Sequence, residues 1–296
     1  MVIGDKAFDK LELDYQAKEL GAKSSTKSGR ELLALYDSTI ARLYNFDKIS
    51  ERFVGRDEEL NKLNNFAQVA LNGQGKPVFI IGDPGIGKTE LVNQFFNAKN
   101  LPELRENAQA NILTGRYFDI GKNNSYKVFL DGFYRTISQL EKQNFSDELV
   151  LKKIKTLSTY LQEVKDLSSS VFLQESDKER TKYKSFELLA QNYELLSSIF
   201  PIVLFLDDLQ WADELGLEFL AYLIRAMQGK PLFLVCTVRE RELFVENHPL
   251  RTWMRSMSRY NSYEQIKLRP FTESETEFLI SRIFSAHNFT EATTTK

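Results

Sequence analysis

The feature that most constrains this chain is a glycine-rich stretch between a short apolar run and the start of a predicted helix. Residues 82–89 read Gly-Asp-Pro-Gly-Ile-Gly-Lys-Thr and match the pattern G-x-x-x-x-G-K-[ST] at every fixed position. Its glycines permit backbone conformations in which successive N–H groups converge on phosphate oxygens. The stretch therefore predicts a strand, a phosphate-binding loop and a helix, and it indicates that the chain binds a nucleoside triphosphate.

Individual residues of this loop have predicted roles. Lys88 is expected to reach the β- and γ-phosphates, and the hydroxyl of Thr89 is expected to ligate Mg²⁺. The helix that begins near Lys88 adds unpaired N–H donors and the positive end of its dipole. A glycine-rich turn that binds nothing is the alternative, but it leaves the lysine and threonine without a reason. The loop residues predicted to contact the nucleotide are Gly82, Asp83, Pro84, Gly85, Ile86, Gly87, Lys88, Thr89 and Glu90.

A second apolar run, residues 201–206, ends in two carboxylates, Asp207 and Asp208. Its continuous apolar character is typical of a strand in a parallel sheet that is covered on both faces. Asp207 is predicted to hold Mg²⁺ through water, and Asp208 is predicted to orient or deprotonate the attacking water. The alternative is that the pair only caps the following helix.

Two arginines are further candidates, each with a structural alternative. Arg239 follows the apolar run 234–238 and is placed to sense the γ-phosphate; the alternative is a surface ion pair with Glu240 or Glu242. Arg56 precedes the acidic start of a predicted helix, where it could lie against the base or ribose of the nucleotide. Its alternative is a salt bridge at that helix start.

Predicted strands and helices alternate along the chain. The strands are expected at residues 77–82, 111–118, 201–206, 231–238 and 265–268. This alternation predicts an α/β fold with a doubly wound parallel sheet whose ligand lies at the carboxyl ends of the strands. A helical insertion is expected over residues 126–200, with its polar stretch 166–184 as a surface loop. Residues 272–275 read Thr-Glu-Ser-Glu and predict the cap of a last helix.

Composition excludes several classes of protein. Among 296 residues, 39 are basic and 41 acidic, giving a net charge of −2, which argues against a broad nucleic-acid footprint. Cys236 is the single cysteine, so no intrachain disulfide forms and a reducing compartment fits. No apolar run approaches the ~18 residues of a membrane helix, and the N-terminus lacks the layout of a signal peptide. We therefore expect a cytoplasmic protein without a membrane span.

Several stretches together resemble the STAND-type signal-transduction ATPases of the AAA+ superfamily. The resemblance spans about residues 51–285 and rests most on the loop at 82–89 and on the run Leu-Phe-Leu-Asp-Asp-Leu-Gln-Trp-Ala-Asp at 204–213. It also includes Phe-Val-Gly-Arg-Asp-Glu-Glu-Leu at 53–60, Thr-Val-Arg at 237–239 and Leu-Arg-Pro-Phe at 268–271.

The resemblance implies a five-stranded sheet in the order 5-1-4-3-2, ATP and Mg²⁺ as ligands, and a nucleotide-controlled switch capable of self-association. By position it implies Lys88 and Thr89 for phosphate and Mg²⁺, Asp207 and Asp208 for Mg²⁺ and water, and Arg239 as sensor. Arg56 matches the family's arginine that approaches the nucleotide. Many relatives have glutamate where this chain has Asp208; the arm is shorter by one methylene, which predicts poorer water positioning and slow turnover.

Three segments are expected. Residues 1–50 form an N-terminal helical or linker segment, with a helix over 28–44, or the end of an upstream domain; residues 51–270 form the ATPase core; residues 271–296 begin a helical lid. Because the chain stops inside the first lid helix, we expect either a fragment of a longer protein or a truncated gene model. Expected partners are ATP and either other domains of that polypeptide or a second copy, bound through the core; nucleic acid is not expected.

Three other functions stay open. The first is the ATPase module of a class III nucleotide cyclase, because residues 7–37 faintly resemble the closing strands of such a domain. The second is a DNA-binding ATPase of the origin-recognition type, against which the near-neutral charge speaks. The third is a scaffold that uses ATP only to order its fold.

Overall fold

A computed structural model describes residues 2–4, 29–31, 53–96, 110–118, 127–141, 143, 145–170, 178–259 and 262–285. The chain divides into two compact units, Met1–Glu51 and Arg52–Lys296. In the first unit, β1 (Val2–Gly4) pairs antiparallel with β2 (Gly29–Glu31), and Ile3 lies opposite Arg30.

The helix predicted over residues 28–44 is wrong at residues 29–31, which form β2. The helical periodicity that predicted it begins only at Leu32, so these three residues carried no apolar signal of their own. Their backbone pairs with a strand far away in the sequence, and local periodicity cannot report such a partner. The rest of that predicted helix lies outside the described residues.

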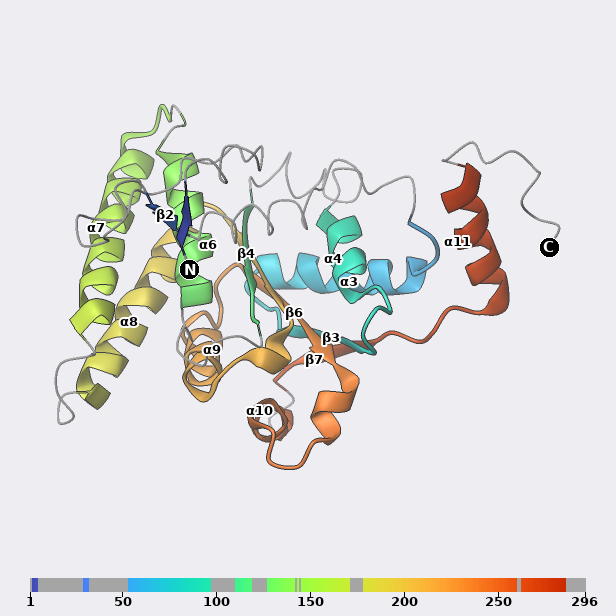
Figure 1. The fold of residues 1–296 in the computed structure, drawn as a ribbon. Coiled ribbons are helices and arrows are strands. Elements are labelled where there is room, and N and C mark those ends of the chain that lie inside the picture. The colour runs from blue at the N-terminus through green and yellow to red at the C-terminus, as the bar shows by residue number, and fades with distance from the viewer. Residues whose placement is uncertain are drawn as a thin grey trace. The chain divides into compact units, whose positions relative to one another are not determined.

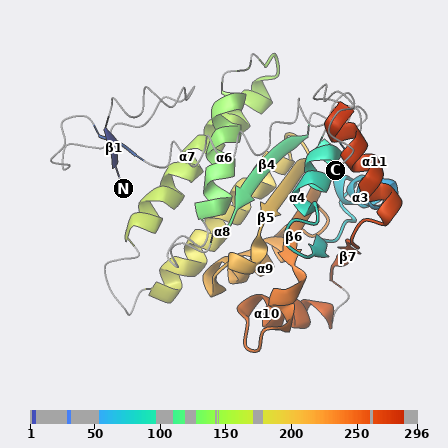
Figure 2. The ribbon, with the colours of Figure 1, turned by 45° about the vertical axis from the view of Figure 1, so that its right-hand side comes forward.

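The second unit is built on a five-stranded parallel sheet. Its strands are β3 (Val78–Gly82), β4 (Asn111–Arg116), β5 (Ile202–Asp207), β6 (Leu232–Arg239) and β7 (Glu264–Lys267). They lie side by side in the order β4-β5-β6-β3-β7 (Figures 1 and 2). Numbered in chain order and read from the β7 edge, this is 5-1-4-3-2, so the predicted fold class and strand order are confirmed.

Strand register brings the candidate residues to one edge of the sheet. Gly82 at the end of β3 lies opposite Arg239 at the end of β6, and Arg116 at the end of β4 lies opposite Asp207 at the end of β5. All these strands run parallel, so their carboxyl ends meet along the same edge.

Helices cover both faces of the sheet. On one face lie α3 (Asp57–Leu71) and α4 (Lys88–Phe96), where the ring of Phe95 lies 5.7 Å from that of Phe233 and the ring of Phe96 lies 6.1 Å from that of Phe205. On the other lie α6 (Lys127–Leu140), α8 (Lys178–Ser197), α9 (Glu214–Ala226) and α10 (Pro249–Ser258). The two-sided cover explains why β3 and β5 are buried along their whole length.

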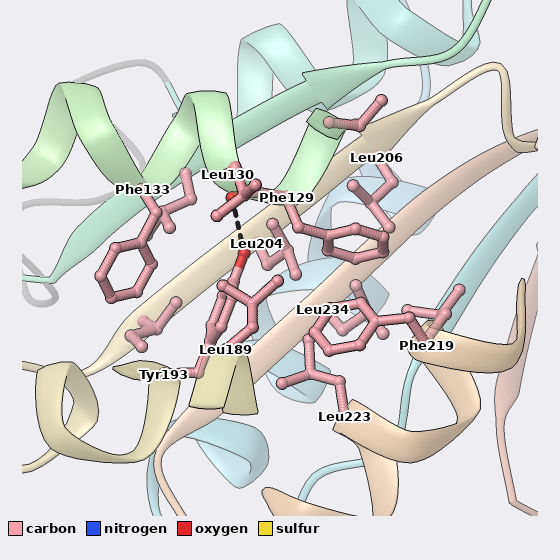
Figure 3. Close-up of a cluster of buried hydrophobic side chains, with 14 of the residues drawn as sticks. Phe129, Leu130, Phe133, Leu189, Tyr193, Leu204, Leu206, Phe219, Leu223 and Leu234 are labelled. Carbon is pink, nitrogen blue, oxygen red and sulfur yellow. Dashed lines mark hydrogen bonds between the residues drawn. The ribbon is translucent and has the colours of Figure 1, made fainter. Parts of the chain in front are cut away.

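An aromatic cluster ties the helical insertion to the central strands (Figure 3). The rings of Phe129 in α6 and Phe219 in α9 lie 4.7 Å apart in a T-shaped arrangement. Tyr193 in α8 packs 5.1 Å from Phe133, and its hydroxyl donates to the carbonyl of Phe129 at 3.2 Å. Because that hydroxyl has a partner, the whole tyrosine can be buried without an unpaired polar atom.

The loop predicted over residues 166–184 is wrong at both ends. Helix α7 (Glu148–Ser170) continues through residue 170, and α8 already begins at Lys178. The start of α8 is held by polar contacts rather than an apolar face: Lys182 Nζ donates to Glu218 Oε1 at 3.0 Å and lies 4.6 Å from the Tyr183 ring centroid. A prediction based on the polarity of these residues therefore assigns the start of α8 to a loop.

The remaining elements follow the carboxyl ends of β5, β6 and β7. Two 3-10 helices, η2 (Leu209–Trp211) and η3 (Glu240–Phe244), follow β5 and β6, and α11 (Glu273–Ser285) follows β7. The predicted cap of α11 is confirmed, since the Thr272 N–H donates to Glu275 Oε2 at 2.7 Å and the Glu275 N–H donates to Thr272 Oγ1 at 3.3 Å. Within the described ranges, no helix is both long and apolar enough to span a bilayer.

The aromatic cluster of Figure 3 allows the packing of the fold to be tested directly. Phe219 is fully buried against Phe129 and Phe186, whereas Phe244 is 74% exposed. Phe219→Ala is expected to lower the free energy of unfolding by about 3–5 kcal/mol because it leaves a cavity. Phe244→Ala serves as the matched control and should change it by less than about 0.5 kcal/mol. Urea denaturation followed by circular dichroism measures both; equal effects would contradict this packing.

Candidate functional site

The β3–α4 loop has the geometry of a phosphate-binding loop. Gly85 and Gly87 adopt φ of 77° and 96°, a region that side chains rarely enter. The crest of the loop is exposed at Asp83, Pro84 and Gly85, whereas Gly82 is buried at the end of β3. The loop thus leads from a buried strand, through an accessible turn, to the free N–H groups at the start of α4.

Lys88 is folded back over this loop. Its Nζ donates to the carbonyl oxygens of Gly82 at 3.0 Å and Asp83 at 2.8 Å. The side chain is largely buried, and this burial lowers the pKa of the ammonium group. Two neutral carbonyls are weaker partners for a buried ammonium than a phosphate anion, so the geometry favours an anion at this position.

Thr89 and Asp207 lie in direct contact. Thr89 Oγ1 donates to Asp207 Oδ1 at 3.1 Å and lies 3.3 Å from Oδ2. Thr237 Oγ1 also donates to Asp207 Oδ1, at 2.5 Å. Asp207 is 1% exposed, and burial raises the pKa of its carboxyl above the usual range despite these donors. A hydroxyl and a buried carboxylate this close offer hard oxygen ligands to one divalent cation such as Mg²⁺.

Asp208 is held by three neighbouring side chains. Its Oδ2 accepts from Arg116 Nη2 at 2.8 Å and Nε at 3.2 Å. Its Oδ1 accepts from Gln210 Nε2 at 2.7 Å and lies 3.5 Å from Arg239 Nε. In this conformation both oxygens of the Asp208 carboxylate, which was predicted to orient or deprotonate the attacking water, accept hydrogen bonds from protein side chains.

Arg239 pairs with Asp208 at the site, and the alternative, a surface ion pair with Glu240 or Glu242, is not what the structure shows for it. Besides its contact with Asp208, its guanidinium carbon is 5.4 Å from the ring centroid of Trp211. Glu240 instead pairs with Lys267 at 3.4 Å. Lys88, Asp207, Asp208 and Arg239 are thus gathered at the carboxyl edge of the sheet.

A family model described as an AAA ATPase domain matches residues 52–235. The chain belongs to this family. The match covers the loop, the aspartate pair and the first half of β6, and it supports nucleotide binding. The five-stranded sheet described above agrees with the P-loop NTPase fold. The narrower assignment to STAND-type ATPases stays a prediction.

The chain is also similar to several solved structures. The Aeropyrum pernix ORC1 protein in complex with DNA has a TM-score of 0.46 at 17% identity, covering 82% of this chain and 53% of that one. The Aeropyrum pernix ORC2 protein in ADPNP–ADP complexes gives 0.46 at 16% identity, covering 82% and 55%. A Walker-type ATPase of Pyrococcus abyssi gives 0.41 at 13% identity, covering 80% and 59%.

This chain therefore spans between half and three fifths of the length of those structures. A comparison with curated proteins finds no match.

Arg56 lies in a buried contact with the segment that follows β7. It is the residue before α3 and has a φ of 66°. Its Nη1 lies 3.2 Å from Glu59 Oε1, its Nη2 donates to the carbonyl of Arg269 at 2.5 Å, and its guanidinium carbon is 4.6 Å from the Phe271 ring centroid. The predicted alternative, a salt bridge at the helix start, is thus present. Contact of Arg56 with a nucleotide stays a prediction.

Three residues of this site escaped the sequence reasoning: Arg116, Gln210 and Thr237. Arg116 ends β4, so the rule that ligands gather at strand ends would have found it if applied to the second strand. Thr237 precedes the end of β6 by two residues, and its threonine type interrupts an otherwise apolar run. Gln210 gave no signal beyond its place in the run 204–213, since its role depends on two neighbouring strands.

Asp207 allows a prediction in which stability and binding move in opposite directions. Asp207→Asn removes a buried charge, so the nucleotide-free protein should be at least as stable as the wild type. Its affinity for ATP in Mg²⁺ should fall to the value measured in EDTA. Urea denaturation and calorimetry measure the two effects, with Asp57→Asn on the exposed first turn of α3 as the control.

The same substitution gives a pH dependence. Because the folded pKa of Asp207 is raised, the folded wild type retains a proton that the unfolded chain loses, and its stability falls as pH rises toward the folded pKa. The stability advantage of Asp207→Asn in EDTA should therefore grow with pH above the ordinary aspartate pKa of about 3.9. An advantage that shrinks with pH would contradict the buried charge.

Proposed function

We propose that this AAA ATPase domain is the ATP·Mg²⁺-binding regulatory module of a multidomain signalling protein, with slow ATP hydrolysis and a nucleotide-dependent switch. The observation that carries it is the contact of Thr89 Oγ1 with Asp207 Oδ1 at 3.1 Å, beside the folded-back Lys88. Its partners are other domains of the longer polypeptide or a second copy, bound through the core. The single cysteine supports a cytoplasmic location.

Each of the predicted site residues has a role in this proposal. The loop residues 82–90 and Lys88 bind the phosphates, and Thr89 and Asp207 hold the hydrated Mg²⁺. The metal supplies charge neutralisation at the phosphate oxygens. Asp208 orients the attacking water, and Arg239 binds the γ-phosphate. Arg56 lies against the base or ribose and ties this end of the domain to the segment after β7.

Slow, regulated turnover is supported by the ion pair of Arg116 with Asp208. A carboxylate oxygen that accepts two guanidinium N–H bonds has little capacity left for a water proton. A triphosphate brings anionic oxygens that compete for Arg116 and Arg239. Bound nucleotide thus favours release of Asp208, which couples occupancy of the site to its chemistry.

Nucleotide binding is tested by calorimetry with ATP and Mg²⁺. The wild type should bind, and Lys88→Gln should weaken binding by about tenfold to a hundredfold, the size of one charge-assisted hydrogen bond. Lys62→Gln removes the same charge from the exposed face of α3 and should bind like the wild type. A flat titration with well-folded wild-type protein would overturn the proposed function.

The ion pair is tested by single-turnover hydrolysis with protein in excess over ATP. Arg116→Gln should raise the rate severalfold, because it frees Asp208 from its counter-ion. Asp208→Asn should abolish hydrolysis, and the double variant should be equally inactive. Arg180→Gln on the exposed face of α8 is the control. A rate that falls in Arg116→Gln would show that Arg116 assists the reaction instead of restraining it.

A further inference from the structure

The side-chain amide of Gln210 makes two hydrogen bonds next to the site and has no role in the proposed function. It lies in η2, directly after the aspartate pair, and is 2% exposed. Its Nε2 donates to Asp208 Oδ1 at 2.7 Å, and its Oε1 accepts from the backbone N–H of Arg239 at 3.1 Å. Both ends of one buried amide are thus used to join Asp208 to the end of the neighbouring strand β6.

We propose that Gln210 is a positioning residue for ATP hydrolysis, fixing the Asp208 carboxylate relative to the end of β6. This inference rests on the proposed function. It assigns Gln210 a task in the reaction step and none in holding the nucleotide, since its side-chain amide bonds to Asp208 and to the backbone of Arg239.

The backbone of Asp208 shows why such support is needed. Asp208 has a φ of 57°, a conformation that costs free energy for a residue with a side chain and persists only when its surroundings hold it. Its N–H donates to Thr237 Oγ1 at 2.9 Å. Strand β6 therefore holds Asp208 twice, at the backbone through Thr237 and at the carboxylate through Gln210.

Gln210 and Arg116 bind different oxygens of Asp208 and differ in charge. Arg116 binds Oδ2 and neutralises the carboxylate, whereas Gln210 binds Oδ1 with a neutral amide and leaves the charge in place. When Arg116 is drawn away, Gln210 still fixes the direction of the carboxylate. Oδ2 is then the oxygen that faces the attacking water, in an orientation set before the nucleotide arrives.

Two substitutions separate positioning from packing. Gln210→Glu keeps the length and the acceptor for the Arg239 N–H but replaces the donor by an oxygen that repels Asp208 Oδ1. Gln210→Met keeps the length and removes both hydrogen bonds. Gln68→Glu and Gln68→Met, on the exposed face of α3, are the matched controls.

Three quantities are measured for each variant: the dissociation constant of ATP in Mg²⁺, the single-turnover rate of hydrolysis, and the urea midpoint. Both Gln210 variants should lower the rate by about 10²-fold, as expected for a displaced reacting group, while the dissociation constant stays that of the wild type. An unchanged rate would overturn the inference. So would a rate and an affinity that fall together in step with the midpoint, because that result is a packing defect.

Binding and hydrolysis by the wild-type protein distinguish a failure of this inference from a failure of the proposed function. Wild-type protein that binds ATP but hydrolyses it no faster than Asp208→Asn overturns the role of Gln210 and leaves nucleotide binding intact. Wild-type protein that binds no ATP overturns both. If the variants fail to fold, amide hydrogen exchange of the wild type decides: the Arg239 N–H must stay protected when a non-hydrolysable ATP analogue and Mg²⁺ bind, and faster exchange on binding would overturn the inference.

Discussion

The burial of Asp207 is the constraint on which the site depends. A carboxylate that is 1% exposed is costly to ionise unless hydrogen-bond donors or cations surround it, and the partners of Asp207 come from three different elements. Thr89 comes from the start of α4, Thr237 from β6, and Arg116, 3.6 Å away, from the end of β4. The loop, the central strands and the neighbouring strand end must therefore keep one mutual position.

That mutual position is provided by the sheet and its two apolar covers. Parallel pairing fixes Arg116 opposite Asp207 and Gly82 opposite Arg239, so a slip of one residue would turn the side chains of the slipped strand to the other face. The aromatic contacts of α4 on one face and of α6 and α9 on the other resist such a slip. The polar edge is thus positioned by residues that take no part in its chemistry.

The phosphate-loop motif and the aspartate pair could be predicted from sequence because each lies in a short, contiguous stretch, and the fold class could be predicted because strands and helices alternate along the chain. The strand order followed from the resemblance rather than from periodicity. Arg116 was missed because the strand-end rule was not applied to the second strand, and Gln210 was missed because its role depends on a neighbouring strand, which a linear reading does not show. The same reason accounts for β2, whose partner strand is distant, and for the start of α8, where ion pairs replace the apolar face that predicts a helix.

The charges around the site explain why the Asp208 carboxylate is restrained. Three cationic groups, Lys88, Arg116 and Arg239, face two carboxylates, Asp207 and Asp208. In this structure both arginines contact Asp208, and Lys88 donates to backbone carbonyls. A triphosphate is the better partner for all three cations, since each would exchange a protein acceptor for a more highly charged one. On the proposed function, nucleotide binding and release of Asp208 are two consequences of one redistribution of hydrogen bonds, and the neutral Gln210 is the side chain expected to keep its bond to the Asp208 carboxylate.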